Sequence, residues 1–140
     1  MKDDTLFLQQ QPRLRALAWR LLGTRADAED AVQDCWLRWR ETEGVTRAEA
    51  WLVTTCTRLC LDRLRARRRR HYRGEWLPEP QPDEPIDALP ETHRADLSYA
   101  LLHLLEGLSP AERAAWVLAE CLEYDHGELA NVLAREPAAC

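Results

Sequence analysis

Residues 50–70, AWLVTTCTRLCLDRLRARRRR, decide the class of fold. The apolar members of the stretch recur at helical spacing on one side: Leu52, Cys56, Leu59, Cys60 and Leu64. The other side is polar and largely basic: Thr54, Arg58, Arg65 and Arg69. This pattern predicts an amphipathic helix with one face in a hydrophobic core and the other available to a polyanion.

Arginine density in and after this helix is high. Eight arginines lie between positions 58 and 73, against one acid, Asp62. Basic residues also suit the negative pole at the C-terminal end of a helix, which would explain some of them without any ligand. A run this dense exceeds what such capping requires, and it favours neutralisation of nucleic-acid phosphates.

The net charge of -5 hides a division of the chain into two electrostatic halves. Residues 1–73 carry 16 basic and 10 acidic side chains, a net of +6. Residues 74–140 carry 3 basic and 14 acidic side chains, a net of -11. The acidic average therefore does not exclude nucleic-acid binding by the first half.

Composition also disfavours several classes of protein. No apolar run approaches the roughly 20 residues that span a bilayer, and Lys2 is followed by two acids rather than a signal-peptide core. We therefore expect a cytoplasmic chain with no membrane partner. The four histidines are scattered and no glycine-rich phosphate loop is present, so we do not expect an enzyme.

The five cysteines are odd in number and irregularly spaced, and three of them fall on predicted apolar helix faces. Cys56 and Cys60 stand four residues apart, but no second pair of Cys or His is placed to complete a tetrahedral site. We expect structural thiols, no metal and no cofactor.

The residues before the basic helix predict two further helices. One spans about Thr5 to Leu22, ends at Gly23 and turns inward Leu14, Leu17, Ala18, Leu21 and Leu22. The other spans about Arg25 to Arg40 and turns inward Ala28, Ala31, Val32, Cys35 and Trp39. The tetrapeptides that begin at Thr24 and Thr46 both have the form of a capping box, which predicts two helix starts.

An acidic ridge runs along the second of these helices: Asp27, Asp30, Asp34 and Glu41. A ridge of this kind can simply be a solvated face. It can equally steer a basic protein partner toward the helix. The residues alone leave both readings open.

The texture of the sequence changes after Arg73. The segment GEWLPEPQPDEPIDALPET, residues 74–92, contains five prolines and six acids and has no helical period. This composition predicts an extended linker over residues 73–94. Its acidity would suit a strand lying in a basic channel, although solubility alone would also account for it.

Helical pattern resumes near Asp96 with a leucine stripe: Leu97, Leu101, Leu104, Leu105 and Leu108. Ser109, Pro110 and Glu112 then start a helix that runs to about Leu122 and turns inward Ala115, Leu118, Cys121 and Leu122. A third helix starts near Asp125 and turns inward Leu129, Val132 and Leu133. With Pro137 placed to open one more, the order is typical of a helix-turn-helix. That last helix has only about four residues before Cys140, so we expect no base reading through it.

In this order and spacing, the segments AEDAVQD, WLRW, AWL and RLCLDRLR resemble the bacterial extracytoplasmic-function (ECF) sigma factors of the sigma-70 family. These are promoter-recognition subunits of RNA polymerase. Residues 24–40 are similar to region 2.2, which docks on the coiled coil of the largest polymerase subunit. Residues 50–70 are similar to regions 2.3 and 2.4, which open and hold the -10 element, and residues 108–140 are similar to region 4, which reads the -35 element. Residues 72–80, YRGEWLPEP, resemble the subgroup that carries a SnoaL-like domain after region 4.

The resemblance implies an all-α fold of two small helical domains. Residues 1–72 would form the sigma region 2 bundle, and residues 95–140 a region 4 unit that stops at the start of its recognition helix. The extended acidic, proline-rich linker would join them. The function implied is that of a sigma factor, which binds core polymerase and directs promoter recognition and opening at the -10 element. The alternative is a truncated helical adaptor that occupies polymerase without productive initiation.

Two binding surfaces follow from the same resemblance. Core RNA polymerase would meet Asp30, Gln33, Asp34 and Leu37. Promoter DNA would be held by Arg58, Asp62, Arg65, Arg68 and Arg69, with residues 41–46 lining a pocket for a flipped base. Asp62 has an equal alternative as an internal partner of Arg58 or Arg65. An anti-sigma factor or a missing C-terminal regulatory domain is a further candidate partner.

Tryptophans in the helical segments are expected to pack rather than to stack on bases: Trp19, Trp36, Trp39, Trp51 and Trp116. Trp51 is the most ambiguous of them, since it could also present an edge near the DNA. Trp76, in the linker, has no helix to bury it, so it needs a dock on its own domain or on another.

Overall fold

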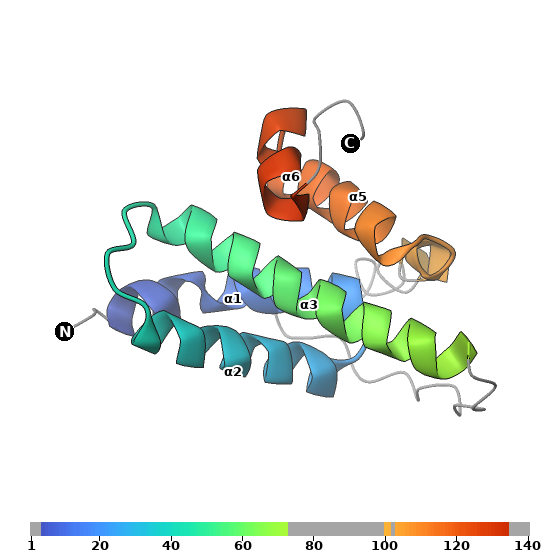
Figure 1. Cartoon of the computed structure of the whole chain (residues 1–140), viewed down its shortest axis with the longest axis horizontal. Helices are drawn as coiled ribbons and strands as arrows, with labels where there is room; N and C mark the ends of the chain where they lie inside the picture. The colour runs from blue at the N-terminus through green and yellow to red at the C-terminus, as the bar shows by residue number, and fades with distance from the viewer. Residues whose placement is uncertain (1–3, 73–99, 102, 135–140) are drawn as a thin grey trace.

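The computed structural model describes residues 4–72, 100–101 and 103–134, and the regular structure in them is entirely helical. Three helices come first: α1 (Asp4–Leu22), α2 (Arg25–Glu41) and α3 (Ala48–Tyr72). After them come helical residues 100–101 and 103–106, then α5 (Pro110–Leu122) and α6 (His126–Leu133). Helices α1, α2 and α3 all pack against one another, while α5 lies on α1 and α3, and α6 lies on α3 and α5 (Figure 1). The predicted all-α class is confirmed.

The predicted inward stripes of the first three helices are buried without exception. The turn between α1 and α2 follows from Gly23, whose φ of +82° is accessible to glycine at little cost and whose N–H donates to the carbonyl of Trp19 at 2.7 Å. Thr24 then caps α2, since its Oγ1 accepts from the backbone N–H of Asp27 at 3.2 Å. Local signals and apolar period together thus account for this three-helix bundle.

The start of α3 differs from the prediction. The helix begins at Ala48, so Arg47 rather than Thr46 precedes its first residue, and the capping box predicted from Thr46 to Glu49 is wrong. The carboxylate of Glu49 instead accepts from Nε2 of Gln10 on α1, at 3.1 Å. The side chain of Glu49 therefore makes a tertiary hydrogen bond in place of the local capping bond.

Helix α3 also buries a second stripe that the periodic reading missed: Val53, Thr57 and Leu61. These residues are four apart and lie about 100° around the helix from Cys56 and Cys60, because successive residues advance by that angle. The first stripe faces α1 and α2. The second lies on the side toward Arg58, which contacts α6, and α3 packs against α1, α2, α5 and α6.

Helix α5 starts as predicted, with Ser109 and Glu112 forming a complete capping box, and α6 starts with the equivalent pair Asp125 and Glu128. The inward face of α5 is rotated from the predicted one. Its buried residues are Ala111, Ala114, Val117 and Leu118. Ala115, Cys121 and Leu122 are only partly buried.

Two further burial predictions in this part of the chain are wrong. Leu104 was placed on an inward leucine stripe, but it is 73% exposed, whereas Leu105 is buried. Trp116 is 39% exposed rather than core, because it lies across α5 from the inward Ala114 and Leu118. Both errors arise where a helix packs over only part of its circumference, which leaves some apolar residues in solvent.

Buried residues of α5 and α6 belong to the same hydrophobic cluster as those of the first three helices. The structure therefore packs the two predicted units together through one continuous core. The predicted linker, residues 73–94, lies outside the described residues, as do Trp76 and the residues 135–140 that would open the recognition helix. No described helix has both the length and the apolar character needed to cross a membrane.

Candidate nucleic-acid and polymerase interface

Arg58 lies on the exposed side of α3 and meets α6 rather than solvent alone. Its Nε donates to the carbonyl of Val132 at 3.1 Å, and its Nη2 donates to the carbonyl of Asn131 at 2.9 Å. Both acceptors are in the last turn of α6. The first residue predicted to contact DNA is thus joined to a helix more than 70 positions further along the chain.

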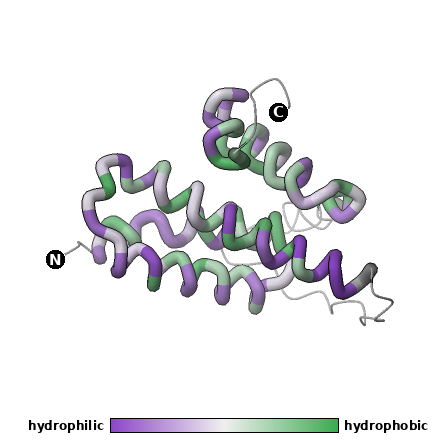
Figure 2. Tube along the Cα trace, viewed as in Figure 1, coloured by the Kyte–Doolittle hydropathy of each residue, from purple (hydrophilic) through white to green (hydrophobic). Residues whose placement is uncertain are grey.

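Arg65, Arg68 and Arg69 gather at the C-terminal end of α3, where the trace is strongly hydrophilic (Figure 2). Together with the first turn of α5, at Ser109, Pro110 and Ala111, they line an open pocket of about 320 Å³. All three residues are exposed. The structure therefore brings three of the predicted phosphate contacts to one place.

Asp62 projects into solvent next to these arginines, with 73% of its side chain exposed. Its Oδ1 lies 4.0 Å from Nη1 of Arg65, and no bond to Arg58 is present among the described residues. Of the two internal partners considered, Arg65 is the one in reach. An exposed pair at this distance contributes little energy, so it leaves the carboxylate available to another group.

Two arginines of the same run, Arg63 and Arg67, point the opposite way. Nη2 of Arg63 contacts the carboxylate of Asp34 at 2.5 Å. Arg67 donates to the carbonyl of Leu22 at 2.8 Å and pairs with Asp27. The sequence already indicated this direction. Arg63 follows Cys56, and Arg67 follows Cys60, by seven residues or about two helical turns, so both arginines share the face of the buried cysteines.

The acidic ridge of α2 is consequently divided into two sides. Asp27 and Asp34 turn toward α3 and are neutralised by it, whereas Asp30 and Gln33 are exposed. Leu37, one turn beyond Gln33, is 50% exposed. Three of the four predicted polymerase contacts therefore lie free on the surface, and the fourth, Asp34, is shared with Arg63.

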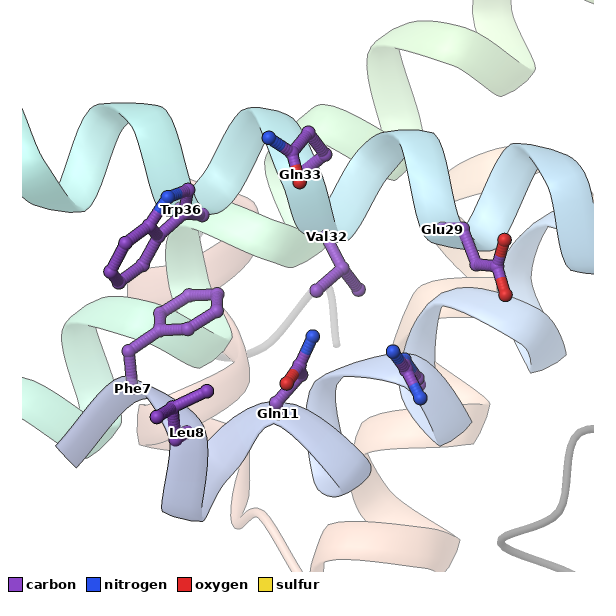
Figure 3. Close-up of a pocket in the computed structure, with 8 residues that line it drawn as sticks. Phe7, Leu8, Gln11, Glu29, Val32, Gln33 and Trp36 are labelled. Carbon is purple, nitrogen blue, oxygen red and sulfur yellow. The ribbon is translucent and has the colours of Figure 1, made fainter. Parts of the chain in front are cut away.

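A groove of about 350 Å³ lies between α1 and α2 next to this surface (Figure 3). Its apolar floor includes the tilted pair Phe7 and Trp36, whose ring centroids are 4.8 Å apart, and Val32. Gln11 from α1 and Gln33 from α2 stand at its polar rim (Figure 3). Sequence reasoning missed the contribution of α1, because only α2 carried a recognised motif.

The remaining tryptophan prediction concerns Trp51, which packs against Trp39 with ring centroids 5.6 Å apart and an interplanar angle of 54°. Trp39 is buried and Trp51 is partly buried, so Trp51 packs between helices as expected. The pair lies where the loop between α2 and α3 joins α3. This loop includes Gly44, whose positive φ of +74° favours glycine.

Cys35, Cys56 and Cys60 lie fully buried between the helices. A hydrogen bond with Cys56, together with burial, raises the pKa of the Cys35 thiol, so it stays protonated at neutral pH. These thiols act as small apolar side chains. Within the described ranges, no group of three or more His, Cys, Asp or Glu side chains is arranged to hold a metal ion.

Residues 6–70 match the family model for sigma-70 region 2, which covers α1, α2 and nearly all of α3. The helical bundle with its basic third helix is therefore similar to sigma-70 region 2. The chain is also similar to extracytoplasmic-function sigma factors, as the following relatives show.

The ECF RNA polymerase sigma factor SigJ of Mycobacterium tuberculosis is 42% identical over 134 residues, which cover 90% of this chain and 42% of SigJ. SigE of Mycolicibacterium smegmatis is 35% identical over 136 residues, covering 93% of this chain and 52% of SigE. The crystal structure of M. tuberculosis SigJ matches 98% of this chain and 48% of the SigJ chain, with a TM-score of 0.68 and 37% identity. The chain thus spans about half the length of these relatives or less.

Proposed function

We propose that this chain binds core RNA polymerase and directs promoter recognition and opening at the -10 element. The observation that carries the proposal is the presence of two different surfaces on a single region 2 bundle. One is the exposed side of α2, with Asp30, Gln33 and Leu37, and the other is the arginine-rich side of α3. A sigma factor needs both, because it must join a protein and a polyanion at once.

The polymerase-facing surface combines charge with apolar contact. Asp30 is exposed and makes no ion pair with any described residue, so a basic partner side chain can approach it without competition. Leu37 and the adjoining groove between α1 and α2 offer apolar area for the centre of such a contact. Asp34 would contribute less, since part of its charge is already compensated by Arg63.

The DNA-facing surface suits an opened strand rather than a duplex groove. Arg65, Arg68 and Arg69 lie close enough to line one pocket, and their positive charge would track the phosphates of the strand. Arg58 and Asp62 would contact the strand one to two turns earlier on α3. Residues 41–46, at the last residue of α2 and in the loop that follows it, would line the pocket for a flipped base.

The test is equilibrium binding to purified bacterial core polymerase, followed by promoter opening on a template with a -10 element. We expect an Asp30→Arg, Leu37→Ala double variant to bind core about tenfold more weakly or worse, because it reverses a charge and removes apolar area. Glu120→Arg, on the exposed side of α5, introduces the same charge elsewhere and should bind normally.

A second pair of changes separates the two surfaces. Arg65→Gln with Arg69→Gln should leave core binding intact and reduce promoter opening, since it removes phosphate contacts only. Core binding without opening by the wild-type chain would favour the adaptor alternative. A folded wild-type chain that does not bind core would refute the proposal.

Three finer assignments rest on sequence alone. Membership of the subgroup with a SnoaL-like domain depends on residues 72–80, and regulation by that domain or by an anti-sigma factor depends on the resemblance. We also propose that the chain divides into a region 2 domain, a linker and a region 4 domain.

A further inference from the structure

Arg58 has two candidate partners, promoter DNA and α6. The proposed function assigns its guanidinium to promoter DNA, but in this structure Nε and Nη2 both donate to the last turn of α6. These two nitrogens form one edge of the planar group, and such an edge is what binds two oxygens of a phosphate at once. The same edge cannot serve the carbonyls of α6 and a phosphate together.

The α6 end of this contact is a natural acceptor for a cation. The last carbonyls of a helix have no partner within the helix, and they carry the negative pole of its dipole. Asn131 and Val132 stand in that final turn, and the chain leaves it at Ala134 in the left-handed conformation. Arg58 therefore satisfies two carbonyls that would otherwise depend on solvent.

The buried surface of α3 also contains one polar group without a hydrogen-bond partner. Leu129 and Val132 of α6 are buried, and so are Val53 and Leu61 on the stripe of α3 that lies between Cys56, which contacts α1, and Arg58, which contacts α6. Between Val53 and Leu61 lies Thr57, which is fully buried and whose Oγ1 has no hydrogen-bond partner in the structure. Burying a hydroxyl without a partner opposes docking, because water would satisfy it once α5 and α6 moved away.

We propose that Arg58 is a latch: docking of α6 on α3 and contact of Arg58 with DNA exclude each other. The inference rests on the proposed DNA role of α3. In the docked arrangement α6 occupies one edge of the Arg58 guanidinium and leaves Arg69 and Asp62 exposed. Reaching DNA with the whole arginine surface then requires α6 to leave α3. Conversely, a DNA strand at Arg58 weakens the docking of α6.

The test is a double-mutant cycle in the full chain, with a fluorescent single-stranded oligonucleotide as the DNA and anisotropy at low salt as the readout. Val132→Asp places a charge in the buried α3–α6 contact and should release α6. We expect the variant to bind DNA at least threefold more tightly than wild type, although it carries one more negative charge. The gain should vanish when Arg58→Gln is added. Leu104→Asp adds the same charge at an exposed site and should weaken binding slightly.

Hydrogen exchange separates the outcomes. Accelerated exchange in α6 with unchanged exchange in α1 and α2 would verify that Val132→Asp opens the latch without unfolding the bundle, and Leu129→Ala provides a milder opening if it does not. An opened variant that binds DNA no better than wild type, or better by the same factor without Arg58, would overturn the latch. Failure of binding in every variant would also overturn it. The proposed sigma role would survive either result if the chain, bound to core polymerase, still opened promoter DNA.

Discussion

Thr57 is the residue whose chemistry fits its surroundings least well. It is fully buried on α3, and its hydroxyl has no hydrogen-bond partner in the structure. Thr57→Val keeps the shape of the side chain and removes the polar atom, so we expect it to raise the free energy of unfolding by about 1 kcal/mol. Urea denaturation of the full chain measures this difference.

Thr54→Val serves as the matched control, because Thr54 is on the same helix but only partly buried. Its effect should be within about 0.5 kcal/mol of zero. A loss of stability in Thr57→Val greater than that of the control would mean that the hydroxyl finds a partner in solution and would contradict the argument.

Among single residues, helical periodicity identified most of the core, but we did not use it to distinguish the arginines that bind the bundle from those that face solvent. Leu52, Cys56 and Cys60 were recognised because apolar residues have one favourable place, the interior. An arginine is compatible with solvent, phosphate, a carboxylate or a helix end. As residue types, Arg63 and Arg67 therefore do not differ from the neighbouring arginines, although they bind acids and a carbonyl of the bundle itself.

Among the elements, two capping motifs of similar form had different outcomes. Ser109 and Glu112 make both reciprocal hydrogen bonds at the start of α5, while α3 begins one residue too late for Thr46 to cap it. We expect Ser109→Ala to cost about 1 kcal/mol of stability in α5, because a backbone N–H loses its acceptor. Thr46→Ala should change the stability of α3 by a few tenths of a kcal/mol or less.

Native-state hydrogen exchange of α5 and α3 measures both changes in the same experiment. Equal costs for the two substitutions would refute the assignment of one formed and one unformed cap. The comparison also explains why a motif predicts a helix start only within a residue or two. Tertiary partners such as Gln10, which binds Glu49, compete for the side chains that the motif would use.

In the molecule as a whole, Arg113 fastens the C-terminal helices to the bundle. Its Nε donates to the carbonyl of Leu105 at 3.0 Å, and its Nη1 donates to that of Leu21, near the end of α1, at 2.7 Å. Burial lowers the pKa of this guanidinium, which nevertheless remains charged at neutral pH. Arg113→Met fills similar space without the donors, so we expect docking of α5 to weaken by about 2 kcal/mol.

Exchange rates of the α5 amides, compared between wild type and variant, measure that loss of docking. Arg47→Met removes an exposed arginine and should leave the α5 rates unchanged. If Arg113→Met were equally silent, the hydrogen bond from Arg113 to Leu21 would not be holding α5 to α1, and the arrangement of the two parts would depend on the apolar core alone.

The sequence by itself determined the helices, the main inward stripes of the first three and the resemblance to sigma-70 region 2, because these depend on local period, turn residues and the order of short motifs. Only the tertiary structure decided which groups the arginines of α3 bind, that α1 shares a groove with α2, and that α6 holds Arg58. These features arise from contacts between residues up to 74 positions apart. A guanidinium can satisfy any of several acceptors, and only the packing of the helices determines which one lies within reach.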